Sequence, residues 1–124
     1  CSSDLDVQFT GCVSDEELYS LYQKARLLVQ PSLYEGFGIP PLEALSFGTH
    51  VLISDIPVFR EIYDGYPVSY FHAGDKEDLA AKLVPAFNSA KEPLPPLPQK
   101  YDFAATSALI LKELSETILQ KQTQ

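Results

Sequence analysis

The chain has 124 residues, of which 45% are hydrophobic and 21% charged, and this length and composition fit one folded domain and exclude wholesale disorder. Nine Lys and Arg residues against 17 Asp and Glu residues give a net charge of −8, which argues against binding to nucleic acid or to anionic lipid through general electrostatics. No apolar run approaches the roughly 18 residues of a membrane span, so this segment gives no indication of membrane association.

Short apolar runs alternate with amphipathic stretches along most of the chain. Ser14 and Glu17 form a capping box, which predicts the start of a helix, and Asp75 is predicted to cap a later one. In chain order we predict a strand at residues 7–11, a helix at 14–25, a strand at 27–30, a loop at 31–38, a helix at 41–47, a strand at 50–54, a helical turn at 58–63, a strand at 67–71, a helix from 75 to about 87, and a final helix from 102 to about 119.

The segment before the final helix is rich in proline. Residues 92–98 read EPLPPLP, which predicts an extended polyproline conformation and excludes a helix. We interpret residues 92–100 as a spacer; the alternative is a ligand for proline-binding domains.

Alternation of strands and helices predicts an α/β domain with a mainly parallel sheet of about four strands. Ligands of such sheets bind at the carboxyl ends of the strands, so the loop at residues 31–38 is the first candidate for a site. The two cysteines have no histidine at metal-ligand spacing, so we expect no metal site and a reducing, cytoplasmic setting. Because the chain begins with Cys1 and not with Met, we expect it to be part of a longer protein.

This loop has the composition of an anion-binding site. Gly36 and Gly38 permit backbone conformations that other residues avoid and allow a close approach to a ligand. Because a proline disfavours helical geometry in the residue before it, we expect Ile39 and Pro40 to be extended and Pro41 to start the helix. Such amides at a helix start bind phosphate or diphosphate, and the helix dipole adds to the attraction. The available N–H donors are those of Gly36, Phe37, Gly38, Ile39 and Leu42.

Two acidic residues, Glu35 and Glu43, flank this predicted anion site. Carboxylates repel a phosphate, but their two oxygens suit neighbouring hydroxyl groups, so a phosphate site between two such acids predicts a sugar nucleotide. One acid would hold the ribose and the other the transferred sugar. For each acid an explanation without a ligand remains open. Glu43 would then only stabilise the helix start through the dipole and capping, and Glu35 would be a solvated acid in the loop.

Residues 31–44 (PSLYEGFGIPPLEA) resemble the signature of the family 4 retaining glycosyltransferases, which have the GT-B fold. The family's E-x7-E motif matches Glu35 and Glu43. The resemblance extends over residues 7–105 and includes FTGCVSDEEL at 9–18, GTHVLISD at 48–55, PVFREI at 57–62, YFHAGD at 70–75 and YDF at 101–103. His50 stands where the family usually has proline.

The resemblance implies roles for single residues. Glu43 matches the acid that holds the ribose hydroxyls of the nucleotide, and Glu35 matches the catalytic-site acid that faces the donor sugar. In the mechanism usually described for the family, the leaving diphosphate helps to deprotonate the acceptor, so Glu35 positions the sugar and is no proven nucleophile. No metal or other cofactor is required. The implied donor-binding residues are Glu43, Gly36, Phe37, Gly38, Ile39, Ser32 and Leu42.

The implied activity is transfer of a hexosyl group, with retention, from a nucleotide diphosphate sugar to a glycan or lipid-linked acceptor. Residues 1–91 then form part of a Rossmann-like donor-binding domain, to which the helix at 101–124 belongs. The family places an acceptor-binding domain, two strands and an Arg–Lys pair upstream of this segment, so we expect the segment alone to be inactive. The alternative is a non-catalytic interaction or regulatory subunit that keeps the fold.

The order of strands in the family raises a question about residues 7–11. Two upstream strands normally separate this strand from the one at residues 27–30, and neither is present here. Three outcomes are open: direct pairing of the two strands, pairing with another copy, or insertion of strands from elsewhere. We predict direct pairing, because the helix at residues 14–25 has the length of a crossover between parallel strands.

Overall fold

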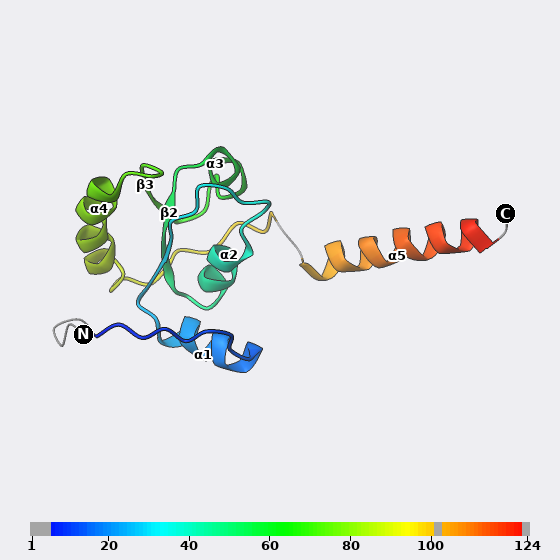
Figure 1. Ribbon diagram of the computed structural model, residues 1–124, viewed down its shortest axis with the longest axis horizontal. Coiled ribbons are helices and arrows are strands. Elements are labelled where there is room, and N and C mark those ends of the chain that lie inside the picture. Colours follow the sequence, from blue (N-terminus) through cyan, green and yellow to red (C-terminus); the bar gives the residue numbers. More distant parts are fainter. Residues whose placement is uncertain (1–5, 101–102, 123–124) are drawn as a thin grey trace.

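The computed structural model describes residues 6–100 and 103–122 (Figure 1). Cys1 and the helix start predicted at Asp102 lie outside the described residues. Within the described ranges, no helix is both long enough and apolar enough to cross a membrane.

A three-stranded parallel sheet lies at the centre of the molecule. Its strands are β1 (Leu27–Gln30), β2 (His50–Ser54) and β3 (Ser69–Phe71), in the order β1-β2-β3. In the register, Leu27 is opposite His50, and Leu52 is opposite Ser69. Because all three strands are parallel, their carboxyl ends meet at one edge of the sheet.

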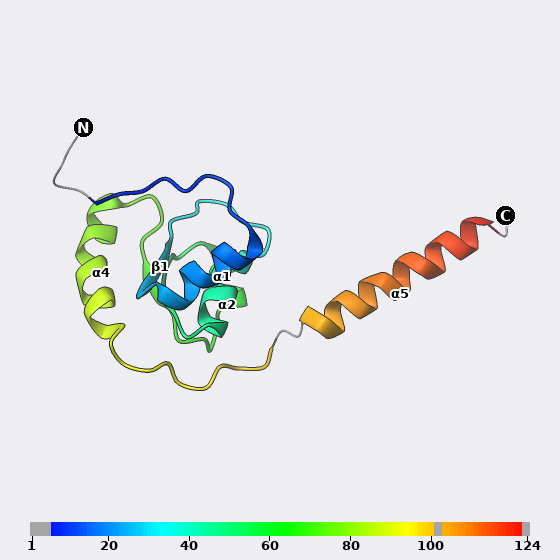
Figure 2. The ribbon, with the colours of Figure 1, turned by 90° about the horizontal axis from the view of Figure 1, so that it is seen from below.

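Helices cover both faces of the sheet, which makes a domain of three layers. Figures 1 and 2 show α4 on one face and α1 and α2 on the other, and α5 extends away from these layers. This arrangement confirms the predicted α/β class. The helices are α1 (Asp15–Lys24), α2 (Ile39–Ser46), α3 (Pro57–Ile62), α4 (Lys76–Ser89) and α5 (Phe103–Gln122).

Both predicted helix caps are present. The Ser14 side chain accepts a hydrogen bond from the N–H of Glu17 at 3.2 Å, and the Asp75 side chain accepts one from the N–H of Asp78 at 3.0 Å. Each bond satisfies an N–H group that the first turn of a helix leaves without a partner.

The hydrophobic core lies between β2 and the helices α2 and α3. Leu52, Ile53 and Phe59 are completely buried, and Leu45 and Tyr63 nearly so. β2 is therefore a central strand whose side chains are covered on both faces, as its continuous apolar sequence predicts.

The predicted strand at residues 7–11 does not form, so the prediction of direct pairing with β1 is wrong, and the sheet has three strands where about four were expected. Contacts of α1 with the end of α2 and with the residue just before β2 account for the difference. Tyr22 stacks on Phe47 with ring centroids 5.9 Å apart, and the Thr49 hydroxyl donates to the carbonyl of Tyr22. The segment before α1 follows that helix, where Thr10 and Val13 line a cavity with α1 residues, and it does not reach β1.

The start of α2 also differs from the prediction. Ile39 and Pro40 are helical, not extended, and α2 begins at Ile39, two residues before Pro41. A proline in the first turn removes only an N–H that would have no partner there, so the penalty is small. Burial of Pro41, Leu42 and Leu45 against the sheet compensates for the steric preference of the residues before each proline.

The proline-rich segment, residues 92–100, contains neither helix nor strand and lies against the core. Leu94 and Leu97 pack against buried residues, and the carbonyl of Glu92 is 2.6 Å from Nε2 of His50. At the other end, Lys100 donates to the carbonyl of Asp64 at 3.1 Å. Polar contacts therefore join both ends of the segment to the rest of the domain.

Candidate functional site

A compact polar network occupies the carboxyl end of β1. The Ser32 hydroxyl donates to Oε1 of Glu35 at 2.6 Å, and Nε2 of Gln30 donates to the same oxygen at 3.2 Å. Gln30 also donates to the Ser32 hydroxyl at 2.9 Å. Glu35 is thus held half-buried by two donors on one oxygen, and among the described residues no donor reaches Oε2. That second oxygen can accept a hydrogen bond from a ligand.

The end of β2 supports this network from the neighbouring strand. Ser54 is completely buried, and its hydroxyl donates to the carbonyl of Ser32 at 2.5 Å. This bond joins the ends of β1 and β2 and fixes the first residues of the glycine loop, residues 31–38.

Gly38 shapes the end of the glycine loop. Its φ is +79°, a left-handed conformation that favours glycine, and it is the N-cap of α2. A Cβ at this position would lie 2.3 Å from Cε1 of Phe59, so a side chain does not fit. The Tyr63 hydroxyl donates to the carbonyl of Gly38, so both contacts come from α3 and the residue that follows it.

The amides next to Gly38 are open to a ligand. Among the described residues, no acceptor receives the N–H of Gly36, Gly38 or Ile39. Ile39 is the first residue of α2, where the dipole favours an anion. Leu42 is the fourth residue of α2, where an N–H donates to the N-cap carbonyl, and its side chain is 7% exposed in the core.

Glu43 lies in the first half of α2, half-buried, beside Tyr22 of α1. Burial, together with the charge of Glu43 and its hydrogen bond to the hydroxyl, raises the pKa of Tyr22 to about 12. Among the described residues, Glu35 and Glu43 have no hydrogen-bond partner in common. The structure therefore places the two predicted acids in separate polar contacts, one at β1 and one between α1 and α2.

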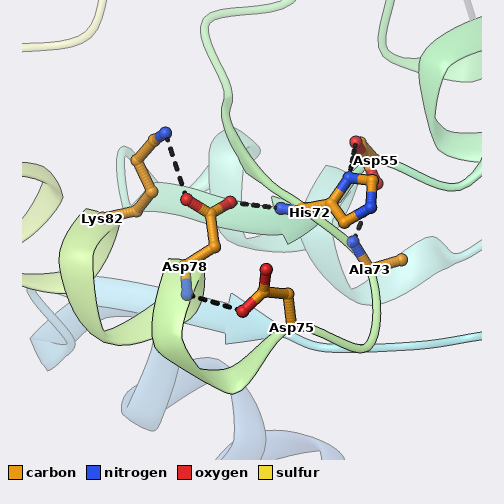
Figure 3. A network of polar contacts seen from close by, with 6 residues as sticks. All are labelled: Asp55, His72, Ala73, Asp75, Asp78 and Lys82. Atoms are coloured by element: carbon orange, nitrogen blue, oxygen red, sulfur yellow. Dashed lines mark hydrogen bonds and ion pairs between the residues drawn. The ribbon is translucent and has the colours of Figure 1, made fainter.

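A second polar network joins the ends of β2 and β3 (Figure 3). Oδ1 of Asp55 accepts the N–H of Ala73 at 2.8 Å, and Oδ2 lies 3.3 Å from Nδ1 of His72. The Ala73 bond is the main reason that the pKa of Asp55 is below its ordinary value, and His72 contributes. Asp78 accepts the N–H of His72 at 2.6 Å, and this bond lowers the pKa of Asp78.

An open cavity of about 240 Å³ lies at the same edge, between the glycine loop and the start of α4. Leu33 and Gly74 belong to its wall and are neighbours, since a Cβ on Gly74 would be 3.7 Å from Leu33. None of the predicted catalytic or donor-binding residues lines it. The lining residues are Pro31, Leu33, Phe71, Gly74, Asp75, Lys76 and Leu79.

Several residues that hold the candidate site together were not predicted from the sequence. Gln30 and Ser54 are polar residues at the carboxyl ends of apolar strands, and that position could have marked them as candidates. Tyr63 and Phe59 carry no such signal, because only the folded chain brings them to Gly38 from 25 and 21 residues away.

Comparisons with known proteins identify the family of the chain. The family model "Glycosyl transferases group 1" matches residues 4–94. The chain is 57% identical over 56 residues to the O-antigen chain mannosyltransferase RfbU of Salmonella typhimurium, covering 45% of this chain and 16% of that protein. It is 42% identical over 71 residues to the serotype-specific mannosyltransferase WbdA of Escherichia coli, covering 57% of this chain and 9% of that protein.

A third relative is the mannosylfructose-phosphate synthase of Agrobacterium fabrum, which is 37% identical over 82 residues, or 65% of this chain and 18% of that protein. The chain therefore spans less than a fifth of the length of these relatives. No solved structure gives a significant match to it. Because the family model covers most of the chain, the chain belongs to the group 1 glycosyl transferases.

Proposed function

We propose that this chain provides the nucleotide-sugar binding part of a retaining glycosyltransferase. The observation that carries the proposal is the glycine loop at the carboxyl end of β1, where open amides at the start of α2 lie next to Glu35. The amides of residues 36–39 suit the diphosphate, and the available oxygen of Glu35 suits a hydroxyl of the sugar.

The remaining donor-binding residues have supporting roles in this proposal. Ser32 holds Glu35, Phe37 packs partly against the core, and Leu42 anchors the start of α2. Glu43 binds the ribose hydroxyls, and its contact with Tyr22 fixes the side chain before the ligand arrives. No metal is needed in this proposal, because amides and the helix dipole stabilise the diphosphate.

The relatives suggest the transferred sugar. Two of them are mannosyltransferases of O-antigen or serotype-specific type, so we propose a mannosyl group as the donor sugar and a glycan as the acceptor. The acceptor would bind to a part of the enzyme that this segment does not include. We also propose a cytoplasmic location, because the proposed donors are nucleotide sugars.

A thermal-shift panel tests the proposal on the 124-residue chain, with GDP-mannose, UDP-glucose and ADP-glucose as probes. A ligand at ten times its dissociation constant stabilises the folded state by about 1.4 kcal/mol and raises the melting temperature by several degrees. We expect one nucleotide sugar to do so and free mannose to have no effect. No shift with any of the three at millimolar concentration would contradict the proposal and favour a non-catalytic interaction subunit.

A further inference from the structure

The contacts of α3 with the glycine loop have a consequence for ligand binding. The Tyr63 hydroxyl donates to the carbonyl of Gly38, and Tyr63 is 1% exposed, so this bond lies inside the core. Phe59 fills the space next to the Cα of Gly38, and its ring meets that of Tyr63 edge-on at 5.8 Å. The two aromatic side chains therefore restrict the same peptide group from two directions.

A planar peptide bond transmits this restriction to the next residue. In a trans peptide, the carbonyl of Gly38 and the N–H of Ile39 point in opposite directions. Because the carbonyl of Gly38 accepts the Tyr63 hydroxyl in the core in addition to the first hydrogen bond of α2, the N–H of Ile39 is directed outward. Ile39 is 44% exposed, and among the described residues no acceptor receives its N–H.

We propose that Tyr63 is a positioning residue that directs the amide of Ile39 toward a bound diphosphate. This inference rests on the proposed function and adds a residue that lies outside the ligand site. Tyr63 touches no ligand; it acts through the Gly38–Ile39 peptide, and Phe59 keeps that peptide from rotating. The sequence around the glycine loop gives no indication of this role.

A purely structural role for Tyr63 would have different consequences. Removing its hydroxyl would then lower the stability of the whole core and would affect all ligand contacts alike. A positioning role predicts a local effect at Gly38 and Ile39 and a selective loss of affinity for the diphosphate. The variant Tyr63→Phe separates these cases, because it keeps the ring and its packing and removes only the hydroxyl.

The experiment compares Tyr63→Phe with Tyr70→Phe in the 124-residue chain. Tyr70 is a matched control, because it also donates to a backbone carbonyl, that of Phe59 at 3.4 Å, and among the described residues no hydrogen bond joins its side chain to the glycine loop. The first measurement is the NMR order parameter of each backbone amide. We expect those of Gly38 and Ile39 to fall in Tyr63→Phe, from values near about 0.85 toward about 0.6, with α4 unchanged. No change at these two amides, or an equal fall throughout the core, would overturn the inference.

The second measurement is the affinity for GDP and for guanosine, or for UDP and uridine if the uridine nucleotide binds better. We expect Tyr63→Phe to lower the affinity for the nucleoside diphosphate about fivefold, which is the effect of one hydrogen bond. The affinity for the nucleoside is expected to be unchanged. Equal weakening of both ligands would overturn the inference. If the wild-type chain binds neither, the proposed function fails, and the order parameters still decide whether Tyr63 holds the loop. Phe59→Leu serves as the second variant if Tyr63→Phe does not fold, with the same expected local effect.

Discussion

Glu35 and Glu43 lie eight residues apart, and the structure gives them different surroundings. One oxygen of Glu35 is occupied by Ser32 and Gln30, which leaves the other for a ligand, while Glu43 shares a hydrogen bond with Tyr22. The two acids are therefore held by different contacts, and the proposed division of labour between sugar and ribose is still to be tested.

This division can be tested with glutamine at each position in an active group 1 glycosyl transferase that carries this segment. Glu43→Gln is expected to weaken nucleotide-sugar binding by about 1–3 kcal/mol, because a charge-assisted bond to the ribose becomes neutral. Glu35→Gln is expected to reduce turnover more than nucleotide affinity. Calorimetry and initial rates measure the two effects. Unchanged donor affinity in Glu43→Gln would remove that residue from the site, and an equal loss of affinity and rate in Glu35→Gln would show that the roles are not divided.

Alanine substitutions of the two glycines in the loop form a matched pair for measuring the free energy of unfolding. Gly38→Ala introduces a Cβ 2.3 Å from the Phe59 ring at a left-handed φ, so we expect a loss of about 2–4 kcal/mol from strain and overpacking. At Gly36 a Cβ would meet nothing within 4 Å and φ is not positive, so Gly36→Ala is expected to be nearly neutral. Urea unfolding measures both. Similar losses in the two variants would contradict the geometry described for Gly38.

The pKa of Asp55 predicts how the stability of the fold depends on pH. Its pKa is lowered in the folded state from the ordinary 3.8, so the ionised carboxylate stabilises the fold above pH 3.8. This contribution is lost as the pH falls through the lower, folded-state pKa. Asp55→Asn is therefore expected to flatten the fall in melting temperature below pH 3.8, and the exposed control Glu61→Gln is not. An unaltered acid profile in Asp55→Asn would contradict the contact with Ala73.

At the scale of elements, the proline-rich segment contributes to the core in addition to linking α4 with α5. Leu97 is partly buried against the core, so Leu97→Ala is expected to cost about 1 kcal/mol, roughly half the value of full burial. Gln99→Ala, at an exposed position in the same segment, is the control. Equal unfolding free energies for Leu97→Ala and the wild type would mean that the segment does not pack in solution.

Local sequence signals predicted the elements that depend on local contacts. The caps at Ser14 and Asp75, and the glycine loop at the carboxyl end of β1, are as expected from residue type and spacing. The start of α2 was missed because burial of its first turn outweighs the preference of residues before proline.

Contacts between distant residues could not be predicted in the same way. Whether residues 7–11 pair with β1 depends on where α1 packs, and that is decided by Phe47 and Thr49, far along the chain. The bonds of Tyr63 to Gly38 and of Tyr22 to Glu43 likewise join residues more than 20 positions apart. Spacing marked Glu35 and Glu43 as candidates but gave no information on which residues hold them.

At the scale of the whole molecule, donor binding, which we propose for this segment, is only one requirement of a transfer reaction. The acceptor must be positioned against the donor, and charge on the leaving diphosphate must be stabilised. The described residues provide one sheet edge with its loop, and β1 pairs with β2 alone. We therefore propose that this segment binds a donor without catalysing transfer, which makes binding the property to measure.

Donor binding at the glycine loop is best tested by an NMR titration of the 124-residue chain with GDP-mannose, with UDP-glucose and ADP-glucose in parallel. We predict that one of these donors shifts the amide signals of Gly36, Gly38 and Ile39, while the signals of α4 and the proline-rich segment remain in place. Shifts that centre on the cavity between Leu33 and Gly74, or no shift at residues 36–39 with any of the three donors, would contradict it.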